Sequence, residues 1–464
     1  MDYDTIKDNL LSVADSSLKY TKLLNPDAEF EIFVFYEHGA EASITQGVVT
    51  AKDGAAAGNA VRVALGKSVG FACSSGISED RIKVSAKEAL DIINSVKVED
   101  EHFDGFCDAK PPANDCIFDK QILELGVDDL INDSESIVRD AKAVDERIKV
   151  AAGAAEFAWG GYAVANSRGV LAATRYGYCA AQANVQAIQN EERKESFDFD
   201  ITTDRMYNIE GLGEKVSKEA LDLLGAQKLE VTDRMTTIWT PISAATYIMS
   251  SLGQSVLGKP VVEGISPLCD MIGDTISSSS LTIIDNGQSK NGLGTFAIDG
   301  EGMPQKTTPL IERGVLKSFL FDSYYGKSFG VESTGNSDRT GGPFGGGVAY
   351  ERSPRVSTKW LELSPGSKTE EELISSVDGK AILIYGFPIG IFHSDVATGE
   401  FSCVVSNSFL VENGEIKQSL APVSVAGNYY EGYKNLTGIG SNVEPLVFGV
   451  AVPTLVIDNL SVTG

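Results

Sequence analysis

The chain has 464 residues, 42% of them hydrophobic and 22% charged, so it is long enough for two or three domains with sizeable cores. With 39 basic against 65 acidic residues its net charge is −26, which argues against direct binding of DNA or RNA, because such binding needs a basic face. The longest nearly uninterrupted apolar run, residues 381–392, contains two glycines and a proline and is too short to span a membrane.

The first residues predict a helix. Residues 1–4 include two acids, and Ile6, Leu10 and Val13 follow at helical spacing, which differs from a secretory signal peptide. We therefore expect a cytoplasmic protein.

Two segments of the N-terminal half repeat a theme. Residues 82–91 (IKVSAKEALD) resemble residues 214–222 (EKVSKEALD), and each amphipathic segment follows alternating, strand-like runs. The first set of runs is 30–36, 42–50 and 60–65, and the second is 148–158, 162–165, 169–176 and 180–188. The pattern predicts two α+β subdomains, residues 1–110 and 111–230, separated by an acidic, proline-bearing stretch at 98–116. Whether they arose by duplication is left open.

Residues 243–257 predict one buried helix. Ser243 follows Pro241 as a cap, and Gly258 with Pro260 ends the pattern. The apolar stripe is Ile248, Leu252 and Val256.

Residues 231–464 predict a β-rich, largely antiparallel domain. The turn sequences Asp285-Asn286-Gly287, Glu312-Arg313-Gly314 and Glu412-Asn413-Gly414 separate short apolar runs and favour hairpins. A last strand is expected at residues 454–457.

One glycine-dense segment, residues 341–347, lacks the Lys-Ser/Thr pair and following helix of a phosphate-binding loop. It is either an ordinary surface loop or a flap over a peptide groove, in which case the polar residues 333–339 before it would contact peptide.

Metal-binding and nucleophilic residues are few and scattered. The six cysteines form no C-x-x-C pair and are expected to be reduced, and the three histidines are His38, His102 and His393. His393 and Cys403 are the only neighbouring base and nucleophile, and nothing in their spacing orients the histidine, so an independent hydrolase is not favoured.

Seven short motifs occur in an order that resembles the TldD/PmbA family. They are residues 299–302 (DGEG), 310–316 (LIERGVL), 333–336 (STGN), 398–402 (TGEFS), 412–416 (ENGEI), 426–428 (AGN) and 453–455 (PTL). The resemblance runs from about residue 230 to the C-terminus, with a weaker one in the N-terminal half.

The resemblance implies a two-subunit peptidase in which TldD carries an H-E-x-x-x-H helix and a downstream cysteine, whereas TldE (PmbA) carries neither. A gap-free alignment places Met249, Ser250 and Gln254 on the His, Glu and His of that motif, and no cysteine follows Gly440. The chain therefore resembles the TldE branch. Because residues i and i+5 lie about 140° apart on an ideal helix, the family's motif needs a distorted helix. Gly253 is either a trace of that distortion or a glycine for close packing.

The resemblance implies a subunit with no catalytic residue and no metal of its own, which positions extended peptide for a zinc-bearing TldD-like partner. Asn336, Arg339 and Phe344 are the expected substrate contacts, and Arg339 is expected to be exposed. The alternative for Arg339 is a structural salt bridge under the glycine loop. The alternative for the whole chain is a homodimeric peptide-binding or scaffold protein.

Overall fold

The computed structural model describes residues 2–96, 98–115, 117–230, 232–290, 292–340, 348–446 and 449–464. The glycine-dense segment 341–347, with Phe344, lies outside the described residues, as does Cys116. Within the described ranges, no helix is both long and apolar enough to cross a membrane.

Two segments of the N-terminal half carry the same order of elements: a helix, three strands and a second helix. The first has α1 (Ile6–Thr21), β1 (Glu29–Thr45), β2 (Val48–Leu65), β3 (Ser68–Ser75) and α2 (Glu79–Val96). The second, after the short helix η1 (Lys120–Glu124), has α3 (Val127–Ala143), β4 (Ile148–Asn166), β5 (Leu171–Gln189), β6 (Glu192–Thr202) and α4 (Leu212–Asp222). All six strands form one sheet in the order β3-β2-β1-β4-β5-β6, with Gly39 of β1 opposite Ala158 of β4 at its centre. A domain boundary at residue 110 and a duplication stay predictions.

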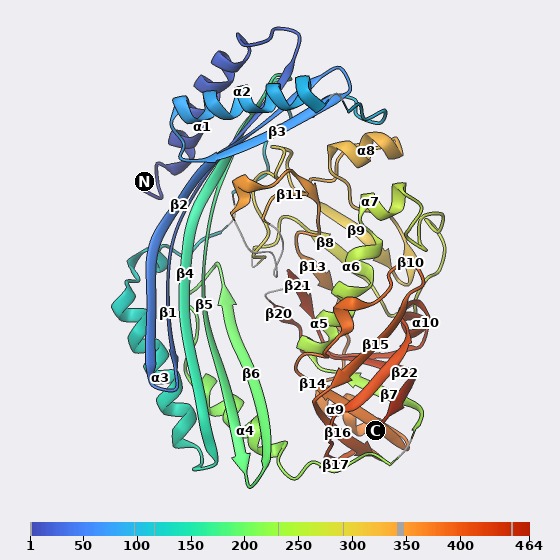
Figure 1. Ribbon diagram of the computed structural model, residues 1–464. Helices are drawn as coiled ribbons and strands as arrows, with labels where there is room; N and C mark the ends of the chain where they lie inside the picture. The colour runs from blue at the N-terminus through green and yellow to red at the C-terminus, as the bar shows by residue number, and fades with distance from the viewer. Residues whose placement is uncertain are drawn as a thin grey trace.

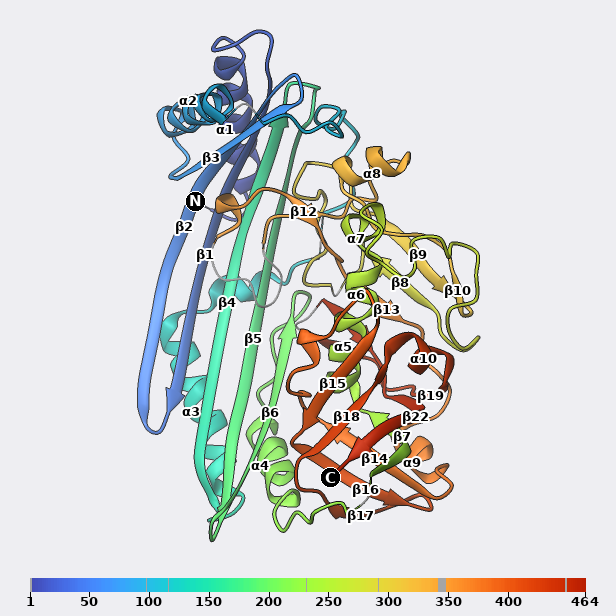
Figure 2. The ribbon, with the colours of Figure 1, turned by 45° about the vertical axis from the view of Figure 1, so that its right-hand side comes forward.

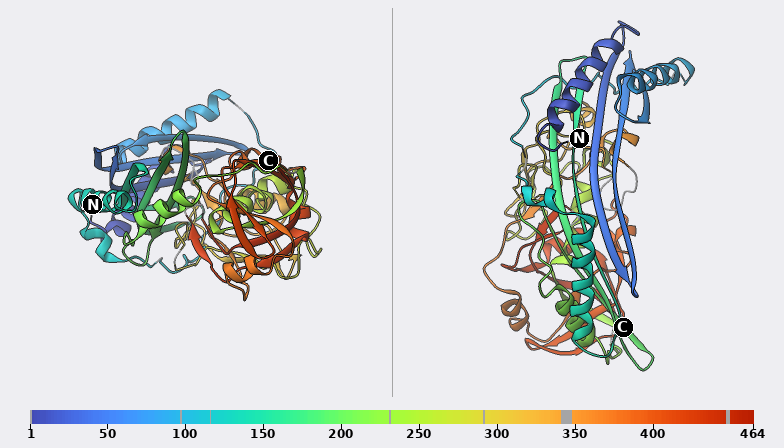
Figure 3. Two further views of the ribbon diagram at one scale, coloured as in Figure 1. Left: turned by 90° about the horizontal axis from the view of Figure 1, so that it is seen from below. Right: turned by 90° about the vertical axis from the view of Figure 1, so that its left-hand side faces the viewer.

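The two faces of this sheet have different neighbours, because successive side chains of a strand point to opposite faces. Ile32 and Val34 of β1 pack beneath α1 and α2, and Ala40 packs beneath α3 and α4. Phe33 and Phe35 point the other way and pack against residues of the C-terminal half. The helices thus cover one face, and the C-terminal domain lies along the other (Figures 1 and 3).

The strands of this sheet are longer than the sequence predicts. The predicted run 30–36 and the first part of the run 42–50 belong to one strand, β1. That strand ends at Thr45, because Gln46 and Gly47 have positive φ and form a turn. Gly58, which lies between two of the predicted runs, stays extended in β2 and leaves room for the Tyr350 ring. Figure 2 shows β1, β2, β4 and β5 running along most of the molecule.

The C-terminal half is β-rich and mostly antiparallel, as predicted. Its helices are α5 (Pro241–Ser250), α6 (Leu252–Ser255), α7 (Gly258–Val262), α8 (Ser323–Phe329), η2 (Ala349–Glu351), α9 (Glu370–Ser375), η3 (Ile391–His393) and α10 (Tyr429–Lys434). One sheet orders β10 (Val315–Leu316), β9 (Thr307–Glu312), β8 (Ile283–Asn286), β13 (Leu361–Leu363), β21 (Val450–Val452) and β20 (Glu444–Leu446). A second orders β15 (Glu400–Val405), β18 (Val423–Asn428), β22 (Leu455–Thr463), β7 (Thr232–Trp239), β14 (Lys380–Tyr385), β16 (Asn407–Glu412) and β17 (Glu415–Ser419), with β19 (Leu436–Ile439) on β22. A small third sheet pairs β11 (Ser337–Asp338) with β12 (Arg355–Val356). The last strand is β22, which begins at Leu455 and so includes all but the first residue of the strand expected at 454–457.

Two of the three predicted hairpins are confirmed. Arg313 with Gly314 and Asn413 with Gly414 connect β9 to β10 and β16 to β17, and all four residues have positive φ, as two-residue hairpin turns require. At the third, β8 and β9 do pair antiparallel, with Asn286 opposite Thr307, but the tight turn is wrong because the chain does not turn back at Gly287. It makes an excursion over residues 287–306 before β9 begins, and this excursion packs against the N-terminal sheet.

The single helix predicted at 243–257 is also wrong in its bounds. The helix starts at Pro241, breaks at Ser251 (φ −114°, ψ −90°) and resumes as α6, while Gly258 begins α7 instead of ending the pattern. The Ser251 hydroxyl bonds the Tyr247 carbonyl at 2.6 Å and the buried Tyr433 hydroxyl at 2.5 Å. Such bonding back to the preceding turn bends helices. The helix is therefore distorted two residues before Gly253.

Candidate functional site

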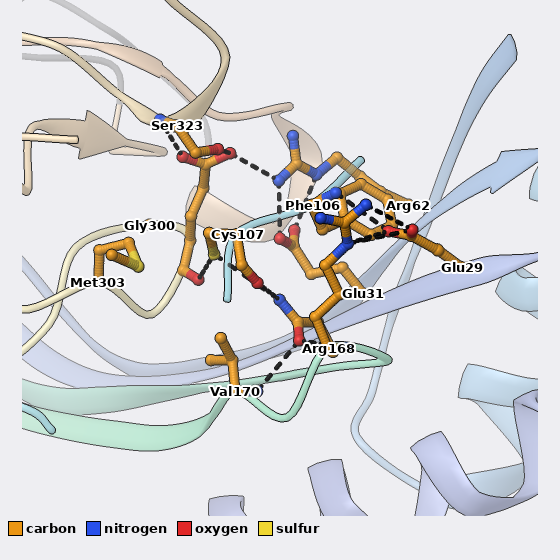
Figure 4. Close-up of polar contacts among 12 residues, drawn as sticks. Glu29, Glu31, Arg62, Phe106, Cys107, Arg168, Val170, Gly300, Met303 and Ser323 are labelled. Carbon is orange, nitrogen blue, oxygen red and sulfur yellow. Dashed lines mark hydrogen bonds and ion pairs between the residues drawn. The ribbon is translucent and has the colours of Figure 1, made fainter. Parts of the chain in front are cut away.

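A buried ionic cluster joins the two halves of the molecule. Glu31 of β1 accepts hydrogen bonds from Arg62 of β2 at 2.7 and 2.8 Å and from Arg339, which follows β11, at 2.6 Å. Arg62 also donates to Glu301 at 2.9 Å (Figure 4). The Glu31 side chain is 0% exposed and that of Arg339 2%. Alternating charges thus neutralise one another where water is excluded.

Aromatic rings and backbone groups complete the cluster. The Arg339 guanidinium lies 4.5 Å from the centre of the Phe33 ring, and its remaining donors bond the carbonyls of Gly300 and Arg352. Burial lowers the pKa of Arg339 to about 10, although Glu31 raises it, so the guanidinium stays charged at neutral pH. For Arg62 burial acts downward too, but Glu31 and Glu301 raise its pKa overall.

The segment 299–302, one of the motifs that carried the family resemblance, forms the C-terminal side of this cluster. Glu301 accepts from the Ser323 backbone and hydroxyl as well as from Arg62. Burial raises the pKa of Asp299 to about 7, with the Glu301 carboxylate adding to the effect. Asp299 accepts backbone N–H groups of Glu301, Met303 and Ser337, so its carboxylate organises the backbone of this segment.

The expectation that Arg339 is exposed is wrong, and the alternative, a structural salt bridge, describes its environment. Asn336 is also buried, at 1% exposure, and donates to Asp285 at 2.5 Å and to the Ser357 carbonyl at 3.0 Å. Both side chains are therefore held by protein groups, because partners from residue 31 and residue 285 fold onto them. Their contact with substrate stays a prediction, as does that of Phe344, which lies outside the described residues.

Beside the cluster, a cavity of about 450 Å³ lies between the helix-free face of the N-terminal sheet and the C-terminal domain. Arg339 and Met249 both line it, so two residues singled out from sequence for different reasons meet at one site. Its N-terminal wall carries Glu37, Glu156 and a group of aromatic rings. Sequence reasoning missed this wall; its signal is the period-two spacing of Phe33, Phe35 and Glu37 along one face of β1.

The three positions aligned with the metal motif point in different directions. Met249 is half-buried and lines the cavity, whereas Ser250 is buried in the core at 4% exposure. Gln254 is exposed and donates to the Met249 carbonyl at 3.4 Å. Gly253 packs on Met249, since a Cβ there would lie 3.3 Å from its sulfur. Close packing is therefore the observed role of Gly253.

Metal-binding and nucleophilic chemistry finds little support in the part of the chain that the structure describes. No group of three or more His, Cys, Asp and Glu side chains is placed to hold a metal ion there. Cys403 is buried in β15, its thiol bonds the Val425 carbonyl at 3.5 Å, and burial raises its pKa to about 12. Because the thiolate is the nucleophile, Cys403 is not activated, and exposed His393 does not change that.

A larger cavity, of about 690 Å³, lies at the β6 edge of the sheet, between β6, α4 and the second C-terminal sheet. Its walls are acidic, and Lys215 lies 2.6 Å from Asp198 within them. Burial raises the pKa of Glu219 and of Glu444 here. Both cavities border β6, which pairs only with β5 among the described strands.

The fold and the sequence together define a member of a metallopeptidase family. Two family models match the chain: the PmbA/TldA metallopeptidase central domain over residues 120–224 and the PmbA/TldA metallopeptidase C-terminal domain over residues 232–464. The chain belongs to the PmbA/TldD family.

The chain is also similar to individual proteins and solved structures. A metalloprotease PmbA homolog of Haemophilus influenzae is 24% identical over 418 residues, 87% of this chain and 85% of that protein. A metalloprotease of Methanothermobacter thermautotrophicus is 29% identical over 235 residues, 51% of this chain, and the match spans only about half of that protein, 49%. The solved TldE of Thermococcus kodakarensis superposes with a TM-score of 0.86 at 22% identity, over 97% of this chain and 100% of that one. A putative modulator of DNA gyrase from Bacteroides thetaiotaomicron gives 0.85 at 19% identity, over 99% and 100%.

Proposed function

We propose that this chain is the TldE-like, non-catalytic subunit of a metallopeptidase complex, and that it positions extended peptide for a zinc-bearing TldD-like partner. Family membership supports the peptidase context. The division of labour between the two subunits is our proposal.

The observation that carries this proposal is that Met249, Ser250 and Gln254 occupy the positions aligned with the His, Glu and His of the H-E-x-x-x-H motif. Zinc in hydrolases is held by imidazole, thiolate or carboxylate groups that converge on one point, with a position left open for water. A thioether in a cavity, a hydroxyl in the core and an amide in solvent are poor ligands and do not converge. Zinc in the complex is accordingly assigned to the partner.

Peptide positioning is supported by the cavity and by β6. An extended peptide can add to an exposed sheet edge through backbone hydrogen bonds while its side chains enter neighbouring pockets. Strand β6 is such an edge, and it borders both cavities. One of its backbone groups, the Glu195 carbonyl, already accepts a hydrogen bond from Asn407. The remaining backbone groups nearer the 450 Å³ cavity are the proposed place of addition.

The proposal is tested by co-expression with a TldD-like subunit. Unfolded-peptide cleavage should need both chains, should be abolished when the partner's motif glutamate is replaced, and should be nearly unchanged in Ser250→Ala of this chain. Chelator-sensitive cleavage by this chain alone, after contaminants are removed, would contradict it.

A homodimeric peptide-binding or scaffold protein is the second candidate, since the same cavity could hold peptide without a partner. Copurification separates the two. A chain that forms a stable homodimer by light scattering, and that recovers no TldD-like subunit on co-expression, favours the second candidate.

A further inference from the structure

The 450 Å³ cavity is lined by a connected series of aromatic rings. Phe33 contacts Tyr162 with ring centres 5.3 Å apart, and Phe296 lies 6.0 Å from Tyr162 and 5.2 Å from Tyr176. Phe296 comes from the excursion at residues 287–306, and the other rings come from β1, β4 and β5. Aromatic faces carry negative potential and attract organic cations.

Two carboxylates on the same sheet face lie at the far end of this series from Arg339. Glu37 accepts a hydrogen bond from the Tyr176 hydroxyl at 2.7 Å. Glu156 is half-buried, and among the described residues no cation pairs with it. Its cross-strand neighbour Glu41 is already paired with Lys52 at 3.2 Å. Glu156 therefore faces the cavity as an acid to which no described cation is paired.

The two cations of the cavity wall do not fill this role. Arg339 is held by Glu31, and the buried Lys359 ammonium donates to the Ser337 carbonyl at 2.6 Å. Both cations therefore belong to the C-terminal wall of the cavity, and their partners are groups other than Glu156.

The cavity wall also holds a polar group without a partner. The Ser337 hydroxyl is fully buried and finds no hydrogen-bond partner within the described residues. Most buried polar groups in proteins are satisfied, so such a group in a cavity wall points to a ligand or to water.

We propose that this cavity is a subsite for a basic side chain, Lys or Arg, of an extended peptide, with Glu156 and Glu37 receiving the charged group. The proposal deepens the peptide-positioning role above and rests on it. The alkyl stem of the basic side chain packs on Phe296 and on the Met249 thioether, because Lys and Arg bury their stems on apolar surface. Met249, which is aligned with the first histidine of the metal motif, then supplies an adaptable apolar wall for the stem of the bound side chain.

The electrostatics of Glu156 agree with this assignment. Burial, together with the Glu41 and Glu37 carboxylates, raises the pKa of Glu156. A bound cation offsets the mutual repulsion of these acids, and that gain is larger in a partly enclosed cavity than at the open surface.

The test uses the intact chain and three labelled octapeptides that differ at one central position: arginine, its neutral isostere citrulline, or glutamate. Fluorescence anisotropy should give the arginine peptide about tenfold tighter binding than the citrulline peptide, with glutamate weakest. In Glu156→Gln the preference for arginine should fall to about twofold. In Glu210→Gln, which removes an exposed acid outside the cavity, it should persist.

The outcomes separate this inference from the proposed function. Equal binding of the three peptides overturns the basic subsite and leaves peptide positioning intact, whereas failure of all three contradicts the proposed function. A second measurement then judges the subsite directly: n-butylguanidinium should bind the wild-type chain about tenfold more tightly than neutral n-butylurea in a ligand-observed NMR titration, and Glu156→Gln should lose that preference. Equal binding of the two probes to the wild type overturns the inference.

Discussion

The Nη2 atom of Arg339 lies 2.6 Å from a carboxylate oxygen of Glu31, a residue 308 positions earlier in the chain. Both side chains are inaccessible to water, and each belongs to a different half of the molecule. This contact, with Arg62 and Glu301 beside it, fixes the C-terminal domain on the sheet and thereby forms one end of the proposed peptide cavity.

Replacing Arg339 should chiefly lower stability. Arg339→Ala leaves part of the Glu31 charge uncompensated in a buried place, and breaking a buried ion pair typically costs about 3–5 kcal/mol. Calorimetry and urea unfolding should show this loss, whereas exposed Arg193→Ala should change little. A variant with unchanged stability and weakened peptide binding would return Arg339 to the role of a direct substrate contact.

The fit between the sheet and the C-terminal domain should be sensitive at Gly58. A Cβ there would lie 2.3 Å from ring carbons of Tyr350, so Gly58→Ala must displace that ring, at a cost of about 1–3 kcal/mol. Gly54 lies on the same strand, where an added Cβ would meet nothing within 4 Å, and Gly54→Ala is the matched control. Equal unfolding midpoints for the two variants would contradict this account of the interface.

Asp322 should make stability fall as pH rises. Burial, followed by the Glu301 charge, raises its pKa to about 7 in the folded protein, against 3.8 for an ordinary aspartate. The folded state therefore binds more protons than the unfolded state between about pH 4 and 7, and this group's contribution to stability declines across that window. Asp322→Asn keeps an acceptor for the Tyr325 N–H and removes the effect.

The stability of Asp322→Asn relative to wild type should thus increase from pH 4 to pH 7, by on the order of 2 kcal/mol. Urea unfolding of both proteins at several pH values measures it. A difference that is constant with pH would show that Asp322 titrates normally.

Zinc should not bind stoichiometrically at α5 and α6. Elemental analysis after zinc reconstitution of metal-free protein should find well under one ion per chain, because the Met249 thioether and the Gln254 amide are weak ligands for zinc. One tightly held zinc ion per chain, lost in Gln254→Ala or Met249→Leu, would contradict the proposal that this chain is non-catalytic.

Local sequence determined the elements whose signals are local. The Arg313-Gly314 and Asn413-Gly414 turns form as predicted because left-handed φ values at two adjacent residues are a property of the turn itself. The stripe of Ile248, Leu252 and Val256 is buried as its spacing predicts. The family resemblance follows from the order of short motifs. The α+β class follows from strand-like runs with amphipathic segments after them, and the β-rich C-terminal domain from its turn sequences.

Only the tertiary structure decided where charges and cavities lie. Arg339 is predicted to be exposed beside a glycine-rich loop, and it is buried because Glu31 and Phe33 reach it from the other half of the chain. The Ser251 hydroxyl at the helix break also bonds the hydroxyl of Tyr433, which lies 182 residues away. Glu156 gains its place in the cavity only when the face of β4 that carries no helix meets the excursion at residues 287–306. Such pairings depend on long-range packing, which local propensity and periodicity do not encode.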